Sequence, residues 1–411
     1  MVITGLDTPE EEKTLLASKS IKRLSWAQFG LWVSLFATAL MGGAPRAGAS
    51  DQDFEVIYSF HDNGDGGGPY GDVVMDAAGN IFGTTFNHNG ASTPGDVFSI
   101  SPDGTERVLY HFKGRKDGTY PNSDLVRDRK GNLYGTTEGG GTDDAGVVFK
   151  LAPDGKEKPI YAFTRPDSAV PESITLGKHG TLYGAATNGC CCCGYIYKLS
   201  KGGTETVLYT FTGGEDGGSP FGQLVEDAQG NLYGATSGGG AYGAGVVFKL
   251  TPDGKETVLH AFMGGSDGSD PQGGLVADKA GNLYGTTYLG GVTGGGGGTV
   301  FKIAPDGTET VLYRFCSVAN CADGWEPAGN LLLDRNIYGT TTRGAYVSFN
   351  GTIFKLAPDG TEVVLHAFEG GSDGGRPNDL YQDTTDPDGY LYGTGGTYGA
   401  YGAGNVFKLK K

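Results

Sequence analysis

The sequence predicts an all-β fold, a seven-bladed β-propeller made of four-stranded antiparallel blades. Three observations predict it: one phrase recurs seven times, each repeat divides into four short strands, and the two ends of the repeat region complement each other. Repeats of roughly 20 to 50 residues that each form one sheet are typical of propellers. The 76 Gly, 22 Tyr and 20 Phe among the 411 residues supply turns and a core.

A phrase of the form Gly-Asn-Leu-Tyr-Gly-Thr-Thr gives the period. Its inner glycine recurs at steps of 52, 49, 50, 51, 54 and 54 residues, as Gly83, Gly135, Gly184, Gly234, Gly285, Gly339 and Gly393. Long apolar helices with a period of 3.6 residues do not occur between these phrases. The period therefore indicates one sheet per repeat, not a pair of helices.

The fourth repeat shows the four strands most clearly. Apolar and aromatic runs lie at 224–225, 231–234, 246–250 and 257–262, separated by Gly, Asp and Pro. Short runs bounded in this way are typical of β-strands. The Pro-Asp-Gly step at 252–254 suits a tight hairpin, because Pro sets φ and Gly accepts a positive φ.

The ends of the repeat region predict how the ring closes. Residues 54–60 match the fourth strand of a repeat, whereas the last repeat ends after its third strand at 406–409. We expect the N-terminal strand to complete the last blade, which removes exposed strand edges. The predicted blades are 69–112, 121–163, 171–211, 220–262, 271–315, 327–368, and 377–409 with 54–60.

Aromatic residues recur at three positions in every repeat, in the second, third and fourth strands. Rings at equivalent positions are expected to pack between blades. The third-strand ring is Phe98, Phe149, Tyr197, Phe248, Phe301, Phe354 or Phe407, and the fourth-strand ring is Phe60, Phe112, Phe163, Phe211, Phe262, Phe315 or Phe368.

The first 49 residues differ from the rest and have the parts of a secretory signal peptide. Basic residues precede an apolar run at about 26–41, and Ala47-Gly48-Ala49 forms a cleavage site. An uncleaved anchor is the alternative, but the apolar run is shorter than the roughly 20 residues of a membrane-spanning helix. We predict cleavage after Ala49, no membrane span in the mature chain, and a secreted or periplasmic location.

The repeat region, residues 54–409, resembles the GloVer (Gloeobacter and Verrucomicrobia type) tandem repeat of exported bacterial proteins. The resemblance lies in the phrases Gly-Asn-Leu-Tyr-Gly-Thr-Thr, Val-Phe-Lys-Leu, Pro-Asp-Gly-Thr-Glu and Val-Leu-Tyr-x-Phe. A weaker similarity runs to NHL-repeat propellers. The first resemblance implies export and implies no particular activity.

We expect ligands on the face that carries the loops between second and third strands. These loops are long, variable and Gly-rich, as at 138–146, 237–245 and 289–298, and variable loops on a rigid scaffold commonly hold ligands. Tyrosines in or beside them could stack on sugars, or could simply pack within the loops. These candidate binding residues are Tyr242, Tyr288, Tyr346, Tyr398 and Tyr401.

An aspartate followed by Gly also recurs near this face. Carboxylates with backbone carbonyls can bind calcium, but Asp also caps turns, and the turn cap is the favoured interpretation. We therefore expect no cofactor, with calcium as the one ion to consider. The aspartates are Asp65, Asp117, Asp216, Asp267, Asp323 and Asp373.

Histidine and cysteine give few catalytic candidates. His88, in a loop of the predicted functional face, is the weak candidate for a general base. Cys316 and Cys321 are predicted to form a local disulfide. Cys190, Cys191, Cys192 and Cys193 form an unbroken run that favours two disulfides over a metal site, with the pairing open.

Composition and charge narrow the partners. A net charge of −16 repels phosphate backbones, so nucleic acid is not an expected partner. We predict a monomeric binding module for glycan, peptide or envelope protein. The alternative is an exported lyase or hydrolase that acts on a polysaccharide or lactone, by analogy of fold.

Overall fold

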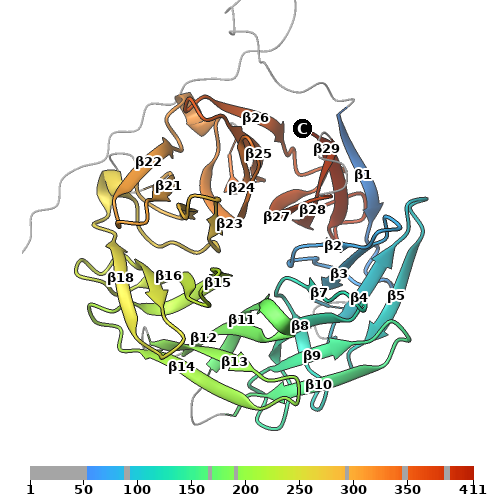
Figure 1. The fold of residues 1–411 in the computed structure, drawn as a ribbon. Helices are drawn as coiled ribbons and strands as arrows, with labels where there is room; N and C mark the ends of the chain where they lie inside the picture. The colour runs from blue at the N-terminus through green and yellow to red at the C-terminus, as the bar shows by residue number, and fades with distance from the viewer. Residues whose placement is uncertain are drawn as a thin grey trace, which may run out of the picture. The chain divides into compact units, whose positions relative to one another are not determined.

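Seven antiparallel β-sheets follow one another around a ring in the computed structural model (Figure 1). The structure describes residues 53–87, 93–164, 169–188, 193–291, 296–344, 350–383 and 389–411. Within these residues each sheet is four strands deep, which confirms the predicted seven-bladed propeller. Helix is limited there to single 3₁₀ turns at Lys178–Gly180, Gly265–Asp267 and Ala319–Cys321. No helix of the described chain is long and apolar enough to cross a membrane.

Blades one to three run from the innermost strand outward. Blade one contains β2 (Val74–Met75), β3 (Ile81–Thr85), β4 (Asp96–Ile100) and β5 (Glu106–His111). Blade two contains β6 (Thr119–Pro121) and β7 (Val126–Arg127), which both pair with β8 (Leu133–Gly139), then β9 (Val147–Leu151) and β10 (Glu157–Ala162). Blade three contains β11 (Ala169–Leu176), β12 (Leu182–Asn188), β13 (Gly194–Leu199) and β14 (Glu205–Phe211).

Blades four to six repeat this order. Blade four contains β15 (Gly218–Glu226), β16 (Leu232–Gly238), β17 (Val246–Leu250) and β18 (Glu256–Ala261). Blade five contains β19 (Val276–Ala277), β20 (Leu283–Thr287), β21 (Thr299–Ile303) and β22 (Glu309–Arg314). Blade six contains β23 (Trp325–Leu333), β24 (Ile337–Arg343), β25 (Thr352–Leu356) and β26 (Glu362–Ala367).

Blade seven is assembled from two distant parts of the chain (Figure 1). Its inner strands are β27 (Gly375–Gln382), β28 (Tyr390–Thr397) and β29 (Asn405–Lys410), and its outermost strand is β1 (Phe54–Ser59). β1 runs antiparallel to β29 and places Val56 opposite Phe407. The N-terminal strand thus occupies the outer position that the last repeat lacks.

The core lies in the seams between blades. In each seam the fourth-strand Phe of one blade meets the third-strand ring of the next, with ring centroids 4.9 to 5.4 Å apart. All seven contacts are edge-on or tilted, the geometry that the quadrupoles of aromatic rings favour. The predicted packing of these rings between blades is confirmed.

The inner glycine of the repeated phrase makes room for this ring. A Cβ at Gly234 would lie 2.7 Å from the ring of Phe248, and a Cβ at Gly285 would lie 2.6 Å from that of Phe301. Both separations are well inside van der Waals contact. The phrase therefore recurs because the second strand must pass directly over an aromatic ring.

Tyr197 is the one third-strand ring that carries a hydroxyl, since the other six are Phe. Its side chain is fully buried, and its hydroxyl has no hydrogen-bond partner. We expect Tyr197→Phe to raise the free energy of unfolding by about 1–2 kcal/mol, because an unsatisfied buried hydroxyl costs that much. Equilibrium unfolding in urea measures the change.

The control for this substitution is Tyr161→Phe. The hydroxyl of Tyr161 donates to Glu205 Oε2 at 2.7 Å, so its removal should lower stability instead of raising it. A loss of stability in Tyr197→Phe would show that this hydroxyl has a partner in solution.

Candidate functional site

A proline lies in or shortly before the innermost strand of every blade. Each proline ring packs against a glycine that precedes the third strand of the preceding blade; a Cβ at Gly95 would lie 2.7 Å from Pro121, and one at Gly404 would lie 2.5 Å from Pro69. The residue before the proline has a positive φ in six of the seven blades: Gly68, Tyr120, Ser219, Asp270, Glu326 and Arg376. This backbone turns the following side chains toward the ring axis.

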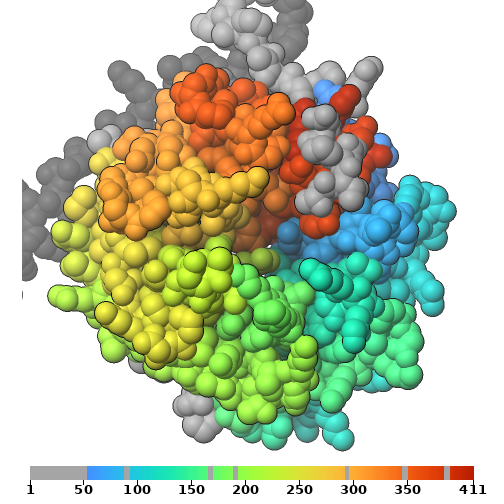
Figure 2. Space-filling view, viewed as in Figure 1, coloured from blue at the N-terminus to red at the C-terminus, as the bar shows by residue number. Residues whose placement is uncertain are grey.

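The side chains after these prolines surround one cavity of about 240 Å³ on the axis, which we call the axial funnel. Thr342, near the end of β24, also lines it, so the funnel opens on the face of the Gly-rich loops. Figure 2 shows the blades meeting around a central hollow. The seven wall residues are Tyr70, Asn122, Glu172, Phe221, Gln272, Ala328 and Asn378.

The floor of the funnel is a network that crosses the ring axis. Asp124 Oδ2 accepts hydrogen bonds from the side-chain amides of Gln223 at 2.9 Å and Asn330 at 3.0 Å. Asp124 Oδ1 accepts the backbone N–H of Asp72 at 2.9 Å. The side-chain amide of Asn330 also donates to Asp379, whose other oxygen accepts the Asn330 backbone N–H at 2.7 Å. These five residues, from blades one, two, four, six and seven, form the axial cluster.

Two carboxyls of the axial cluster favour the protonated form. Burial raises the pKa of Asp379 well above its usual range, and the charge of Asp124 raises it further. Burial, followed by the charge of Asp124, raises the pKa of Asp72 in the same direction. Asp379 is 7% exposed, whereas Asp72 and Asp124 are half-buried. The cluster therefore holds protons at the bottom of a water-accessible cavity.

Glycine shapes the floor as well. In blade five the position equivalent to Asp124 is Gly274, and a Cβ there would overlap the side-chain oxygen of Asn330. Gly329 has a φ of 85°, and a Cβ there would overlap the side chain of Asp379. Blades five and six thus leave space that the amide and carboxyl side chains fill.

Glu172 is the acid of the funnel wall. It accepts a hydrogen bond from the hydroxyl of Thr187 at 2.6 Å. Burial raises its pKa, and the charge of Glu138 raises it further. Glu138 in turn accepts from the side-chain amide of Asn122 at 2.6 Å, and burial raises its pKa too. Among the described residues that line the funnel, every acidic or basic side chain is a carboxylic acid: Asp124, Glu172 and Asp379.

Aromatic rings line the funnel in two places, in blades one and four. Tyr70 is 42% exposed and meets Phe86 edge-on at 5.5 Å between centroids. Phe86 stacks on Tyr120 at 4.9 Å. Phe221 lies in the wall contributed by blade four. The funnel therefore combines flat apolar surfaces with carboxylate and amide groups, as sugar sites require.

A second cavity, of about 380 Å³, lies between blades five and six on the face of the short turns. The turn at 334–336 is two residues shorter than its counterpart at 278–282, which leaves Pro358 and Leu333 at its wall. The polar side chains that line this second cavity all come from the seam between blades five and six. The axial funnel gathers side chains from all seven blades and is therefore the candidate site.

The six recurring aspartates do not converge. Each accepts the backbone N–H of the residue four positions earlier, or six for Asp323, at 2.6 to 3.2 Å. These are the contacts of a turn cap, the alternative to calcium binding. Among the described residues there is no group of three or more His, Cys, Asp and Glu that could hold a metal ion.

The candidate tyrosines are spread over different blades. Tyr242, Tyr398 and Tyr401 are 62%, 47% and 59% exposed, and Tyr401 stacks on His61 at 3.8 Å. Tyr288 is half-buried and donates to Glu326 Oε2 at 2.8 Å. None of these four lines the axial funnel.

Several predicted residues lie outside the described part of the chain. They are the signal peptide at 1–49, His88, Tyr346, Cys190, Cys191 and Cys192. Cys316 and Cys321 do form the disulfide that the sequence predicts, in the loop that leads into β23.

Sequence reasoning missed the axial funnel and its floor. The signal was present two or three residues after the inner-strand prolines, where one repeat has Asp124, another Gln223 and another Asn330. A search for residues that recur in every repeat overlooks the positions at which the repeats differ. Those variable inward positions are where a propeller places its ligand chemistry.

Comparison with known proteins supports the repeat and the fold. A family model described as the Gloeobacter/Verrucomicrobia repeat matches residues 34–193 and 188–407. A search of curated proteins finds no significant match.

Solved structures with a similar fold include three lyases. A catalytically inactive histidine-to-alanine variant of virginiamycin B lyase from Staphylococcus aureus, solved with quinupristin, superposes with a TM-score of 0.60 at 16% identity, over 87% of this chain and 99% of that one. Oligogalacturonate lyase in complex with manganese gives 0.55 at 12%, over 84% and 89%. Polysaccharide lyase Uly1 gives 0.51 at 11%, over 84% and 90%. At these identities the likeness shows the fold alone.

Proposed function

The chain belongs to the Gloeobacter/Verrucomicrobia repeat family, and from the geometry of its axis we propose that it is an exported binding module that holds a neutral glycan in the axial funnel. The observation that carries the proposal is the convergence of seven side chains of six residue types, from one repeat position, on one cavity. A repeat position that only supports the fold would keep one residue type in every blade. A recognition position varies from blade to blade.

The size and lining of the funnel favour a sugar. A cavity of about 240 Å³ lies below the roughly 300–1,000 Å³ of sites for drug-sized ligands, so it suits a single sugar ring or the end of a chain. The amide nitrogen of Gln272 donates one hydrogen bond to Asp270, and that of Asn378 donates to Pro69 O and Thr394. The amide oxygens of Gln272 and Asn378 are therefore the groups that accept from sugar hydroxyls, while Tyr70 and Phe221 offer flat faces. A folded protein partner would not enter it.

Charge favours a neutral ligand over an acidic one. Asp124, Glu172 and Asp379 line the funnel, and no Lys, Arg or His is among the described residues that line it. A uronate would meet these carboxyls without a cation to neutralise it. The proposal therefore separates this chain from the structurally similar oligogalacturonate lyase, whose name gives an acidic sugar.

Export rests on the apolar N-terminal segment and on the Cys316–Cys321 disulfide, since disulfides persist in oxidising compartments. The functional tests therefore use the mature chain that begins at Ser50, purified after expression with its leader. The mass of that mature chain checks the cleavage site.

We expect saturable binding of neutral oligosaccharides by calorimetry, and Phe221→Ala or Tyr70→Ala to weaken it about tenfold or more, equivalent to roughly 1.4 kcal/mol. Tyr242→Ala is the matched control, because this exposed loop tyrosine lies in blade four, like Phe221, but outside the funnel. Equal losses in Phe221→Ala and Tyr242→Ala would move the site to the loops. Preference for uronic oligosaccharides would overturn the charge argument.

A glycoside hydrolase is the second candidate, and Glu172 is the observation that favours it. Its raised pKa suits a proton donor, and Asp124 lines the same cavity as a second carboxyl. The hydrogen bonds that already occupy both oxygens of Asp124 favour binding over catalysis. Release of reducing ends that is lost in Glu172→Gln, with binding retained, would make the hydrolase the better assignment.

A further inference from the structure

Two seams of the propeller bring a pair of acids together at the outer edge. In the seam between blades one and two, Tyr110 of β5 donates to Asp117 Oδ2 at 2.6 Å, and Glu157 begins the outer strand of the next blade. In the seam between blades five and six, Tyr313 of β22 donates to Asp323 Oδ2 at 3.0 Å and lies 3.4 Å from Glu362 Oε2. Each seam thus contains an acid pair bridged by one tyrosine.

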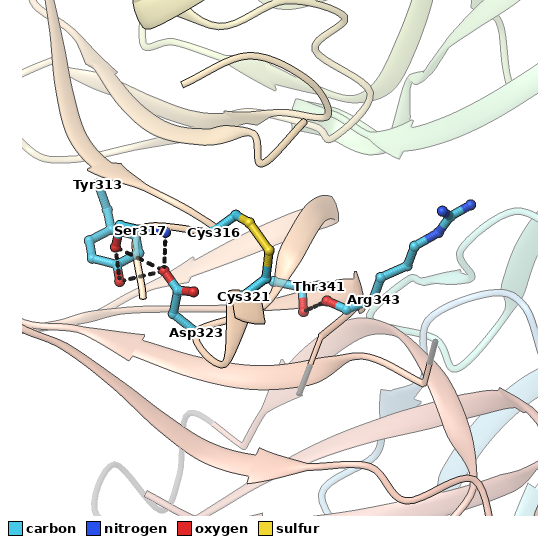
Figure 3. Close-up of a disulfide and its surroundings, with 7 residues drawn as sticks. All are labelled: Tyr313, Cys316, Ser317, Cys321, Asp323, Thr341 and Arg343. Carbon is cyan, nitrogen blue, oxygen red and sulfur yellow. Dashed lines mark hydrogen bonds between the residues drawn. A yellow bond between two sulfur atoms is a disulfide. The ribbon is translucent and has the colours of Figure 1, made fainter. Parts of the chain in front are cut away.

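The second seam can be followed in Figure 3. The backbone N–H and the hydroxyl of Ser317 both donate to Asp323 Oδ2 at 2.9 Å, beside the Cys316–Cys321 disulfide. Asp323 is only 2% exposed, and its other carboxylate oxygen, Oδ1, is buried and accepts no hydrogen bond from the described residues. Such an oxygen is costly unless something binds it.

The same deficiency recurs across both acid pairs. Asp117 Oδ1 is buried without a partner, and Asp117 is only 7% exposed. The opposing glutamates contribute a buried and unpartnered oxygen each, Glu157 Oε1 and Glu362 Oε1. Each seam therefore contains two buried carboxylate oxygens, one on the aspartate and one on the glutamate, that accept no hydrogen bond from the described residues.

The charged neighbours cannot neutralise both acids. Glu157 faces Asp117 and Tyr110, with Lys113 as its one cation, and Lys113 lies over the Tyr110 ring at 5.6 Å. Glu362 faces Asp323 and Tyr313. Burial, followed by the charge of the facing aspartate, raises the pKa of Glu157 and of Glu362 to about 7. A metal ion is a poor alternative, because no group of three or more ligating side chains lies among the described residues.

We infer that a proton held by the glutamate joins the blades at each of these two seams, so that the ring tightens at acidic pH and loosens at alkaline pH. The proton turns a buried acceptor oxygen of the glutamate into a donor and removes the repulsion between two carboxylates. Deprotonation leaves two buried charges face to face. This inference does not depend on the ligand of the axial funnel.

The sign of the pH dependence follows from proton binding. The glutamates release their proton near the ordinary value of 4.5 when the chain is unfolded and near 7 when it is folded. Between these values the folded state binds more protons, so stability falls as pH rises. The contribution is complete below about pH 4.5 and is lost as pH rises through about 7. Glu106, Glu256 and Glu309 face Asp65, Asp216 and Asp267 in the same way.

The test is thermal unfolding of the mature chain and of Glu157→Gln and Glu362→Gln, at about pH 5 and about pH 8. Glutamine imitates the protonated acid, so each variant should keep the wild-type Tm at the lower pH and exceed it by roughly 2–4 °C at the higher pH. Glu55→Gln is the control in the outermost strand of blade seven, one residue after Phe54, which occupies the equivalent repeat position. Its side chain is 63% exposed and pairs with Lys408 at 2.9 Å, so it should leave the pH dependence unchanged.

Two results would overturn the inference. The first is a wild-type pH dependence in both glutamine variants. The second is a rise in the wild-type Tm with millimolar calcium at alkaline pH that the variants lack, which would assign the seams to a cation. If the variants do not fold, the infrared carboxylic-acid band of the wild-type chain near neutral pH is the second readout, and its absence there excludes a proton on the seam glutamates.

Discussion

Phe60→Ala is expected to lower the free energy of unfolding by about 3–5 kcal/mol, because it removes a fully buried aromatic ring from the seam that closes the propeller. The side chain is fully buried and meets Phe98 of blade one at 5.1 Å between ring centroids. Its backbone N–H donates to Gly404 O at 3.0 Å, which ties it to the other end of the chain. The substitution opens a cavity where blade seven joins blade one, so it tests whether the N-terminal strand closes the ring. Equilibrium unfolding in urea measures the loss.

Phe262→Ala provides the matched control. Phe262 is fully buried, meets Phe301 at 5.1 Å, and donates its backbone N–H to Gly245 O at 3.0 Å, all within continuous chain. The two substitutions should cost about the same. A large loss in Phe262→Ala with no loss in Phe60→Ala would mean that the ring does not close through residues 54–60.

The fold could be predicted because its physical requirements fall on the same residue types in every repeat. A glycine such as Gly234 recurs because a Cβ would overlap the ring of Phe248, and that ring recurs because it fills a seam against Phe211. Steric and apolar requirements of this kind are local and identical in each blade. Seven copies make them visible without any structure.

The candidate site could not be found in the same way. Asp124 is 206 residues from Asn330 in the sequence, and only the closed ring brings the two to hydrogen-bonding distance. The exposed tyrosines Tyr242 and Tyr398 drew attention because they lie in variable loops, yet they belong to different blades and do not line the funnel. The inward positions vary in residue type, so no phrase marks them.

The floor of the funnel should respond in opposite ways to two substitutions of one residue. Asp124→Ala removes the acceptor of three donors, namely the amides of Gln223 and Asn330 and the backbone N–H of Asp72. We expect it to lower the free energy of unfolding by about 2–3 kcal/mol, since each unsatisfied buried donor costs roughly 1–3 kcal/mol and water in the funnel recovers part. Asp124→Asn keeps an acceptor oxygen and removes the charge.

The outcome of Asp124→Asn depends on which effect of Asp124 dominates at neutral pH. Its charge raises the pKa of both Asp72 and Asp379, so removing it relieves repulsion, and we expect stability equal to or above that of the wild-type chain. Ser173→Ala is the control at the equivalent position of blade three, where the hydroxyl makes one bond, to Gly222 O at 2.6 Å. It should cost about 1 kcal/mol. If Asp124→Asn destabilised the chain as much as Asp124→Ala, the axial cluster would require the charge itself, and a cationic ligand would then replace the neutral glycan as the expected occupant of the funnel.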